Sequence, residues 1–161
     1  MMMRKSVGPG NGTDAKILRS VRQNLLFLVG GIDGKETFAK AFLDAPGSRR
    51  VNLGRELSRY LSAEPPFSLA LTAQSFLQEL HPGCDLFLER IQILFDPGMD
   101  IQPINVLMSM ARSRRVLVDW PGSFDETDHA LVFGDENEAC YRRFSAGLGF
   151  SVFYEPSETI Y

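Results

Sequence analysis

The sequence predicts an α/β fold of three layers, with helices on both faces of a mainly parallel central sheet. Short apolar segments that suit buried strands alternate with longer segments whose apolar residues recur at helical spacing. Pro-Gly and Pro-Pro pairs separate several of these segments and mark turns. The chain has 161 residues, 44% of them hydrophobic, which is enough for one domain with a sizeable core.

Composition also predicts the domain boundaries and the class of protein. We expect the Gly-rich, polar residues 1–12 to be a disordered leader and residues 13–161 to form a single domain. The net charge of −3 argues against a protein that binds nucleic acid over its whole surface. No apolar segment has the length of a membrane span, and the start does not read as a secretory signal, so we expect a cytoplasmic protein. Four residues that could ligate a metal lack the spacing of a zinc site: Cys84, Cys140, His81 and His129.

Helices are expected where apolar residues recur every three or four positions. Thr13 or Asp14 can cap the first of them. Pro103 is tolerated in the first turn of the fifth, and Asp135 with Glu138 resembles a capping box at the start of the last. The expected helices cover residues 13–23, 35–43, 53–61, 69–80, 101–110 and 135–146.

Strands are expected at short apolar runs bounded by turn residues. The run LLFLV is apolar at every position, which suits a strand that is buried on both faces. Two later runs, CDLFLE and VLVDW, carry a carboxylate at or near their ends. The expected strands cover residues 24–29, 49–53, 84–89, 116–120, 130–133 and 151–154.

The stretch LLFLVGGIDGKETFAKAF has the order of a phosphate-binding loop, in which an apolar strand meets a Gly-rich turn, a lysine and a helix. In a parallel sheet such a loop lies at the carboxyl end of its strand. Its backbone N–H groups and the helix N-terminus would face a phosphate, and Lys35 would reach the β and γ phosphates of a nucleotide. The expected cofactor-binding residues are Gly30, Gly31, Asp33, Gly34, Lys35, Glu36 and Thr37.

This loop departs from the usual pattern G-x-x-x-x-G-K-[ST] at two positions. Val29 stands where the first glycine belongs, so Gly30 can serve only if the loop is one residue short. Glu36 replaces the hydroxyl that coordinates Mg²⁺, and Thr37 follows one position later. The alternative interpretation is an ordinary glycine turn between a strand and a helix, with Lys35 on the surface.

Glu89 ends the apolar run LFLE, where a nucleoside triphosphatase places the acid that orients Mg²⁺. We therefore expect Glu89 to be catalytic, and Glu36, Thr37 and Glu89 to be the metal ligands. The next position, often a catalytic glutamate, is Arg90. The alternative is a strand-end acid without a catalytic role.

Arginines gather before the strand that ends at Asp119. In ring-forming ATPases, arginines in this region reach the γ-phosphate held by a neighbouring subunit, and a polar residue at the strand end can sense that phosphate. Arg112, Arg114 and Arg115 are accordingly candidate catalytic residues across a subunit interface. Two alternatives remain open: the arginines complement a helix dipole or surface acids, or they contact DNA.

With these features together, the chain resembles BrxF, the P-loop-containing protein family of bacteriophage exclusion (BREX) defence systems. The resemblance spans residues 25–156 and implies a P-loop NTPase-like core similar to the AAA-type ATPases, without a helical lid domain. It also implies other phage-defence proteins as partners. Its elements are the strand with the phosphate loop, VNLGRELSRYL (51–61), ILFDP (93–97), ARSRRVLVDWPG (111–122) and the expected last helix with Glu138 and Tyr141.

Three functions follow as hypotheses. The first is an ATP- and Mg²⁺-binding protein with weak ATPase activity that assembles as a homo-oligomer or with defence partners. The second is a degenerate P-loop module that does not hydrolyse ATP and serves such a complex as scaffold or regulator. The third is a subunit that contacts DNA. The departures at Val29, Glu36 and Glu89 bear on hydrolysis more than on fold.

Overall fold

The structure, a computed structural model, describes residues 3–4, 13–30, 32–63, 69–146 and 149–154. The helices are α1 (Thr13–Ser20), α2 (Ile32–Leu43), α3 (Leu53–Ala63), α4 (Leu69–Glu79) and α5 (Pro103–Met110), with short 3-10 helices η1 (Ile91–Phe95) and η2 (Pro97–Met99). The strands are β1 (Met3–Arg4), β2 (Leu25–Leu28), β3 (Ser48–Asn52), β4 (Asp85–Glu89), β5 (Val116–Asp119), β6 (Ser123–Asp125), β7 (Ala130–Phe133), β8 (Arg142–Ser145) and β9 (Phe150–Tyr154). Within these described residues, no helix is long and apolar enough to cross a membrane.

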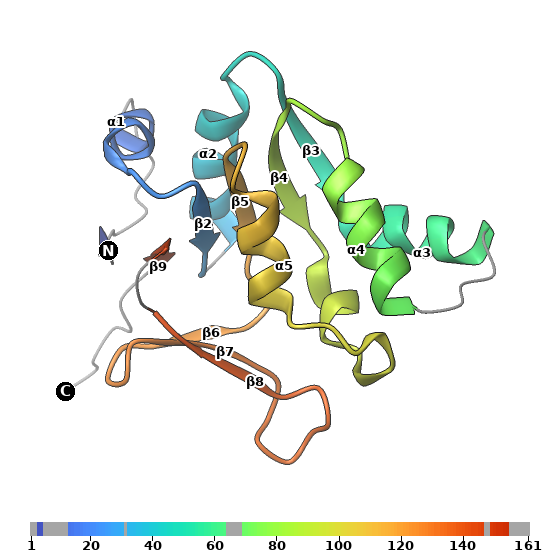
Figure 1. Cartoon of the computed structure of the whole chain (residues 1–161). Helices are drawn as coiled ribbons and strands as arrows, with labels where there is room; N and C mark the ends of the chain where they lie inside the picture. Colours follow the sequence, from blue (N-terminus) through green and yellow to red (C-terminus); the bar gives the residue numbers. More distant parts are fainter. Residues whose placement is uncertain (1–2, 5–12, 31, 64–68, 147–148, 155–161) are drawn as a thin grey trace.

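Six strands form one sheet in the order β1-β9-β2-β5-β4-β3. Every neighbouring pair in it is parallel. The predicted α/β class with a mainly parallel central sheet is therefore confirmed. The strand before the glycine turn, β2, lies inside the sheet with β5 on one side and β9 on the other (Figure 1).

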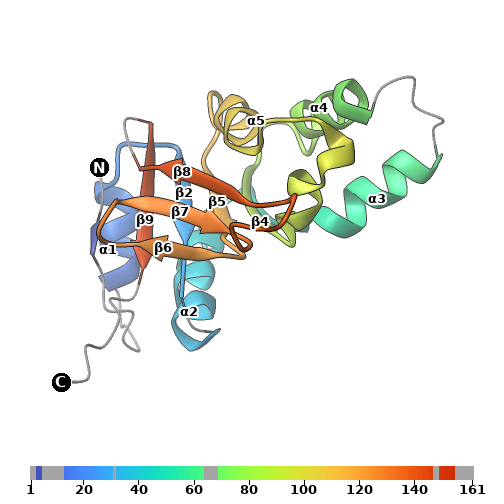
Figure 2. The same ribbon diagram turned by 90° about the horizontal axis from the view of Figure 1, so that it is seen from below.

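Side chains alternate between the two faces of this sheet and bury two separate cores. Leu25 and Phe27 of β2 join the core beneath α3, α4 and α5, whereas Leu26 and Leu28 join the core beneath α1 and α2. The run LLFLV is apolar throughout because both of its faces are covered. Seen from below, the sheet separates α1 and α2 from the other three helices (Figure 2).

A second sheet of three antiparallel strands, β6-β7-β8, lies beyond the carboxyl ends of the parallel strands (Figures 1 and 2). Trp120 fixes it in place: the buried indole N–H donates to the carbonyls of Ser123 at 3.2 Å and Val132 at 3.1 Å. Gly122 is required at this junction, because a Cβ there would lie 1.8 Å from the Val132 carbonyl oxygen.

The helix expected over residues 135–146 is wrong. The hydrogen bond of a capping box does form, since the Glu138 carboxylate accepts from the Asp135 backbone N–H at 3.2 Å. It closes a turn and not a helix, and the chain then continues as β8. The residues of β8 alternate between half-buried and exposed, with Phe144 against Trp120, so tertiary packing decides for a strand.

Two helix boundaries and part of the leader also differ from expectation. α1 ends at Ser20 and not near residue 23. α2 begins at Ile32 and not at Lys35, so the turn before it is shorter than expected. Within the predicted disordered leader, Met3–Arg4 pairs with β9 as a parallel strand, while the leader's other residues lie outside the described part of the chain.

Candidate functional site

The loop between β2 and α2 has only three residues, 29–31. The full phosphate-loop motif uses a longer glycine-rich segment to surround a phosphate with N–H groups. Here Gly34 is buried in the first turn of α2, and Lys35 directly follows it. The N–H groups without intrahelical partners are therefore those of the first helical turn, which is a weaker but usable anion donor set. Gly31 and the side chain of Asp33 lie outside the described residues.

Lys35 points toward the carboxyl end of β5. Its Nζ donates to Asp119 Oδ1 at 2.6 Å and lies 3.5 Å from the carbonyl oxygen of Trp120. The two charged side chains are 21% and 32% exposed, so this ion pair is screened only in part. Lys35 is thus held at the strand ends, not displayed as a free surface lysine.

The period of two along each strand explains why the acids meet α2. Asp119 lies two positions after Leu117, and Glu89 two positions after Phe87; both apolar residues belong to the core under α2. The two carboxylates therefore emerge on the face that α2 covers. Because the strands are parallel, their carboxyl ends also lie at one edge of the sheet, next to the start of α2.

A polar cleft of about 550 Å³ opens at this edge. β2 and β5 are neighbours in the sheet, but the chain leaves β2 toward one face and leaves β5 toward the other. Open α/β sheets bind ligands at the point where the direction of the connections changes in this way. The loops after β2, β3, β4 and β5 all contribute to the lining. The lining residues are Gly30, Lys35, Asn52, Glu89, Arg90, Gln92, Asp119, Trp120, Pro121 and Gly122.

Arg50 joins the two predicted metal-binding glutamates. Its Nη2 donates to Glu36 Oε1 and to Glu89 Oε1, both at 2.6 Å, and its Nη1 lies 3.3 Å from Glu36 Oε2. Its guanidinium also lies 5.3 Å from the centre of the Phe87 ring. The hydrogen bonds to Glu89 and Glu36 raise the pKa of Arg50 above its usual range. The bond from Arg50 likewise lowers the pKa of Glu36.

Mg²⁺ does not fit these residues as they are arranged. A metal between Glu36 and Glu89 would have to displace the guanidinium that already bridges them. Thr37 lines a different hollow, of about 580 Å³, together with Glu36 and Arg50 but without Glu89. Across the described part of the chain, no three His, Cys, Asp or Glu side chains gather to hold a metal ion by themselves.

The three candidate arginines lie away from the cleft, at the amino end of β5. Arg114 is 8% exposed, and its guanidinium donates to the carbonyls of Leu80 and of His81, the latter at 2.9 Å. It thereby satisfies carbonyls that follow the C-terminus of α4. Burial lowers the pKa of Arg114. The predicted role of Arg114 in reaching a neighbouring subunit does not fit this placement.

The other two arginines of the cluster, Arg115 and Arg112, differ in their surroundings. The Arg115 guanidinium donates to the carbonyl of Leu18 at 2.8 Å, near the end of α1, so it complements a helix C-terminus. Arg112 is exposed. Of the three, Arg112 alone retains an open surface position for a partner.

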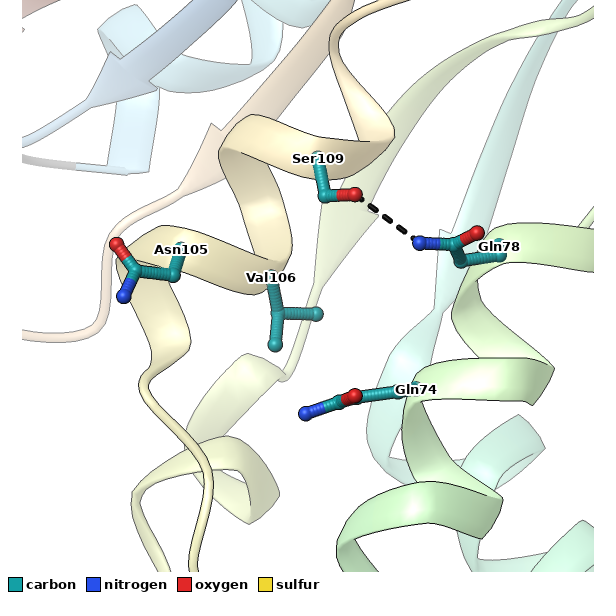
Figure 3. Close-up of a pocket in the computed structure, with 5 residues that line it drawn as sticks. All are labelled: Gln74, Gln78, Asn105, Val106 and Ser109. Atoms are coloured by element: carbon teal, nitrogen blue, oxygen red, sulfur yellow. Dashed lines mark hydrogen bonds between the residues drawn. The ribbon is translucent and has the colours of Figure 1, made fainter.

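A smaller hollow, of about 210 Å³, lies between α4 and α5 (Figure 3). The side chains drawn there are neutral, and Gln78 Nε2 donates to Ser109 Oγ at 3.0 Å. A hollow without a charged group offers little to a phosphate. The strand-end cleft is therefore the candidate functional site.

Sequence reasoning missed Arg50 and Asn52, which lie on β3. Asn52 Oδ1 accepts from the N–H of Arg55 at 3.0 Å and so caps α3 while lining the cleft. The available signal was the pair Arg49–Arg50 in a strand, since adjacent strand residues face opposite ways. One of the two had to lie on the side of α2.

No protein-family model, curated protein or solved structure matches this chain. The side chains at the strand ends therefore carry the functional argument.

Proposed function

We propose that this protein binds the phosphates of a nucleoside triphosphate, ATP, in the strand-end cleft, and that binding rather than hydrolysis is its task. The observation that carries the proposal is the position of Lys35. Its ammonium lies in the first turn of the helix after an interior parallel strand, against the polar end of the neighbouring strand. A cation beside a helix N-terminus at a topological switch point suits a polyphosphate.

Three features favour a binding module over an efficient ATPase. One oxygen of the Glu89 carboxylate accepts a hydrogen bond from Arg50, so a metal ion at Glu89 would lie beside a fixed positive charge. The following residue, Arg90, adds a cation to the cleft and no second carboxylate. The short glycine loop also supplies fewer phosphate donors than the full motif.

The resemblance to BrxF supports a place for this module in a bacterial anti-phage complex, as scaffold or regulator. ATP would then stabilise one shape of the subunit for its partners. The DNA-contacting alternative loses one of its three candidate arginines, because Arg114 is buried. Arg112 is exposed and is therefore the candidate among these arginines for contact with a partner.

Thermal unfolding with and without ATP tests the proposal. Saturating ATP should raise the melting temperature, because a ligand that binds only the folded state stabilises it by about 2.7 kcal/mol at a hundredfold excess over Kd. Lys35→Ala should abolish this shift. The matched control is Lys40→Ala, since Lys40 is an exposed lysine near the end of the same helix.

A phosphate-release assay, at protein concentrations that allow assembly, tests whether the protein binds ATP without hydrolysing it. We expect release no faster than in a sample of Lys35→Ala. Turnover that depends on Lys35 would show an ATPase and contradict the binding-only function. No thermal shift with any nucleotide would contradict the proposal as a whole.

A further inference from the structure

Arg50 occupies the place that the sequence assigned to a divalent cation. It lies between the carboxylate that follows Lys35 on α2 and the carboxylate that ends β4, and it reaches both at 2.6 Å. The contact with Glu36 is a fork, because two guanidinium nitrogens meet two carboxylate oxygens. A fork of this kind orients the guanidinium, although solvent screens the charges because the Arg50 and Glu36 side chains are 40% and 60% exposed.

The position of Arg50 is fixed from several directions. Backbone pairing sets Arg50 opposite Phe87 on β4, and the guanidinium lies over the Phe87 ring. Glu36 holds it from α2, and Glu89 holds it from the end of β4. A planar, permanently charged group is suited to such a bridge. Its removal would leave two carboxylates facing each other without a cation.

Charges around the cleft balance with Arg50 in place. Lys35, Arg90, Glu89 and Asp119 line the cleft, whereas Arg50 and Glu36 line the neighbouring hollow and reach the cleft through the ion pair of Arg50 with Glu89. Together they are three cationic side chains and three carboxylates. A metal added between the glutamates would compete with a cation that already neutralises them. Without Arg50, the same groups would carry excess negative charge and would repel a polyphosphate.

We infer that Arg50 takes the place of Mg²⁺ in this site, so that the protein binds the phosphates of a nucleotide without holding a divalent cation. The inference rests on the proposed function and deepens it by specifying a metal-independent phosphate site. This role of Arg50 also explains why Glu36 stands where a phosphate loop usually carries a hydroxyl residue. The glutamate there binds Arg50 and not a metal ion.

Calorimetric titration with ATP, in EDTA and again in excess Mg²⁺, tests this inference. The Kd of the wild-type protein should differ by less than about threefold between the two conditions, which is under 1 kcal/mol. Arg50→Ala should weaken ATP binding in EDTA by at least about tenfold. Mg²⁺ should restore part of that loss, because the two glutamates are then free to hold it.

Arg49→Ala is the matched control, since Arg49 is the neighbouring exposed arginine on the opposite side of the same strand. Its ATP affinity should stay at the wild-type value in both conditions. Arg50→Lys keeps the positive charge but loses the two-pronged contact with Glu36. This variant replaces Arg50→Ala in the titration if the alanine variant does not fold. Its affinity in EDTA should lie between those of the wild type and the alanine variant.

The outcomes separate this inference from the function on which it rests. Wild-type ATP affinity that drops more than about tenfold in EDTA would overturn the role of Arg50 and leave nucleotide binding intact. If Arg50→Ala bound ATP in EDTA as tightly as the wild type does, the role of Arg50 would likewise be overturned and nucleotide binding would stand. Absence of ATP binding in both conditions would overturn the proposed function. Mn²⁺ titration followed by electron paramagnetic resonance needs no nucleotide: micromolar binding at Glu36 and Glu89 in the wild type would refute the inference.

Discussion

Single side chains decide what the cleft can bind. Asp119 pairs with Lys35, and Arg50 bridges Glu36 and Glu89, so these five side chains already have a partner of opposite sign. A phosphate group entering the cleft would exchange with Asp119 for the ammonium of Lys35. Affinity then depends on the difference between two ion pairs, not on the presence of a lysine alone.

Arg114 is the arginine whose loss should cost most in stability. Arg114→Ala leaves the carbonyls of Leu80 and His81 without this donor inside the protein, and we expect the free energy of unfolding to fall by about 3 kcal/mol. Urea unfolding measures this as a lower midpoint at unchanged slope. The control Arg112→Ala, on an exposed residue of the same cluster, should change it by under about 0.5 kcal/mol.

A loss below about 0.5 kcal/mol in Arg114→Ala would contradict the structural role assigned to the buried guanidinium. Arg114→Lys should recover part of the stability, since one ammonium can reach fewer carbonyls than the guanidinium fork.

At the scale of elements, the sequence predicts the parallel sheet well because its strands are buried on both faces. Apolar runs such as LLFLV and DLFLE need no partner information to be recognised. The second sheet is harder to predict, because its strands are short and half-buried. Its β6 was not expected at all, and β8 was assigned to a helix, since the signal at Asp135 and Glu138 is local while the packing of Phe144 on Trp120 is not.

The residues of the candidate site also divide into those that the sequence could predict and those that it could not. Lys35 and Glu89 could be predicted because glycine turns and strand-end acids leave a pattern along the chain. Arg50 could not be assigned, because its partners depend on the register between β3 and β4 and on the position of α2. The role of Arg114 could not be chosen among the alternatives, because an arginine that bonds carbonyls after a helix and one that faces a partner look alike in sequence.

Docking of the second sheet can be followed through Trp120, the only tryptophan in the chain. Phe144 meets the indole edge-on, with ring centres 6.1 Å apart. Phe144→Ala should admit water to the indole, shift its emission to longer wavelength and lower the free energy of unfolding by about 1–2 kcal/mol, less than for a fully buried phenylalanine. Steady-state fluorescence and urea unfolding measure both.

Ser145→Ala is the control for this pair, because Ser145 is the exposed neighbour on the same strand. It should keep the wild-type emission. An unshifted spectrum in Phe144→Ala, in protein that remains folded by circular dichroism, would show that β8 does not shield Trp120.

Over the whole molecule, the cleft gathers loops that are distant in sequence but share one edge of the sheet. Its lining comes from the ends of β2, β3, β4 and β5, so a bound ligand would tie together most of the parallel sheet. Gly122, which directly precedes the second sheet, also lines the cleft, and no larger residue fits there because its Cβ would meet the Val132 carbonyl of that sheet. Ligand binding should therefore raise the stability of the fold as a unit.

Asp119→Asn tests whether the ion pair between Lys35 and Asp119 at the strand ends weakens binding of that ligand. Asparagine keeps the shape of the strand end but no longer neutralises Lys35, and it removes a negative charge from the cleft. The Kd for ATP should fall by about tenfold at low salt, and the gain should shrink as salt is added. The melting temperature of the ligand-free variant should fall slightly, because a half-buried ion pair is lost. Calorimetric titration against Asp96→Asn, an exposed carboxylate outside the cleft, isolates the effect. Equal ATP affinity in the two variants would mean that phosphate does not meet Lys35, and the cleft would then have to bind its ligand through other groups.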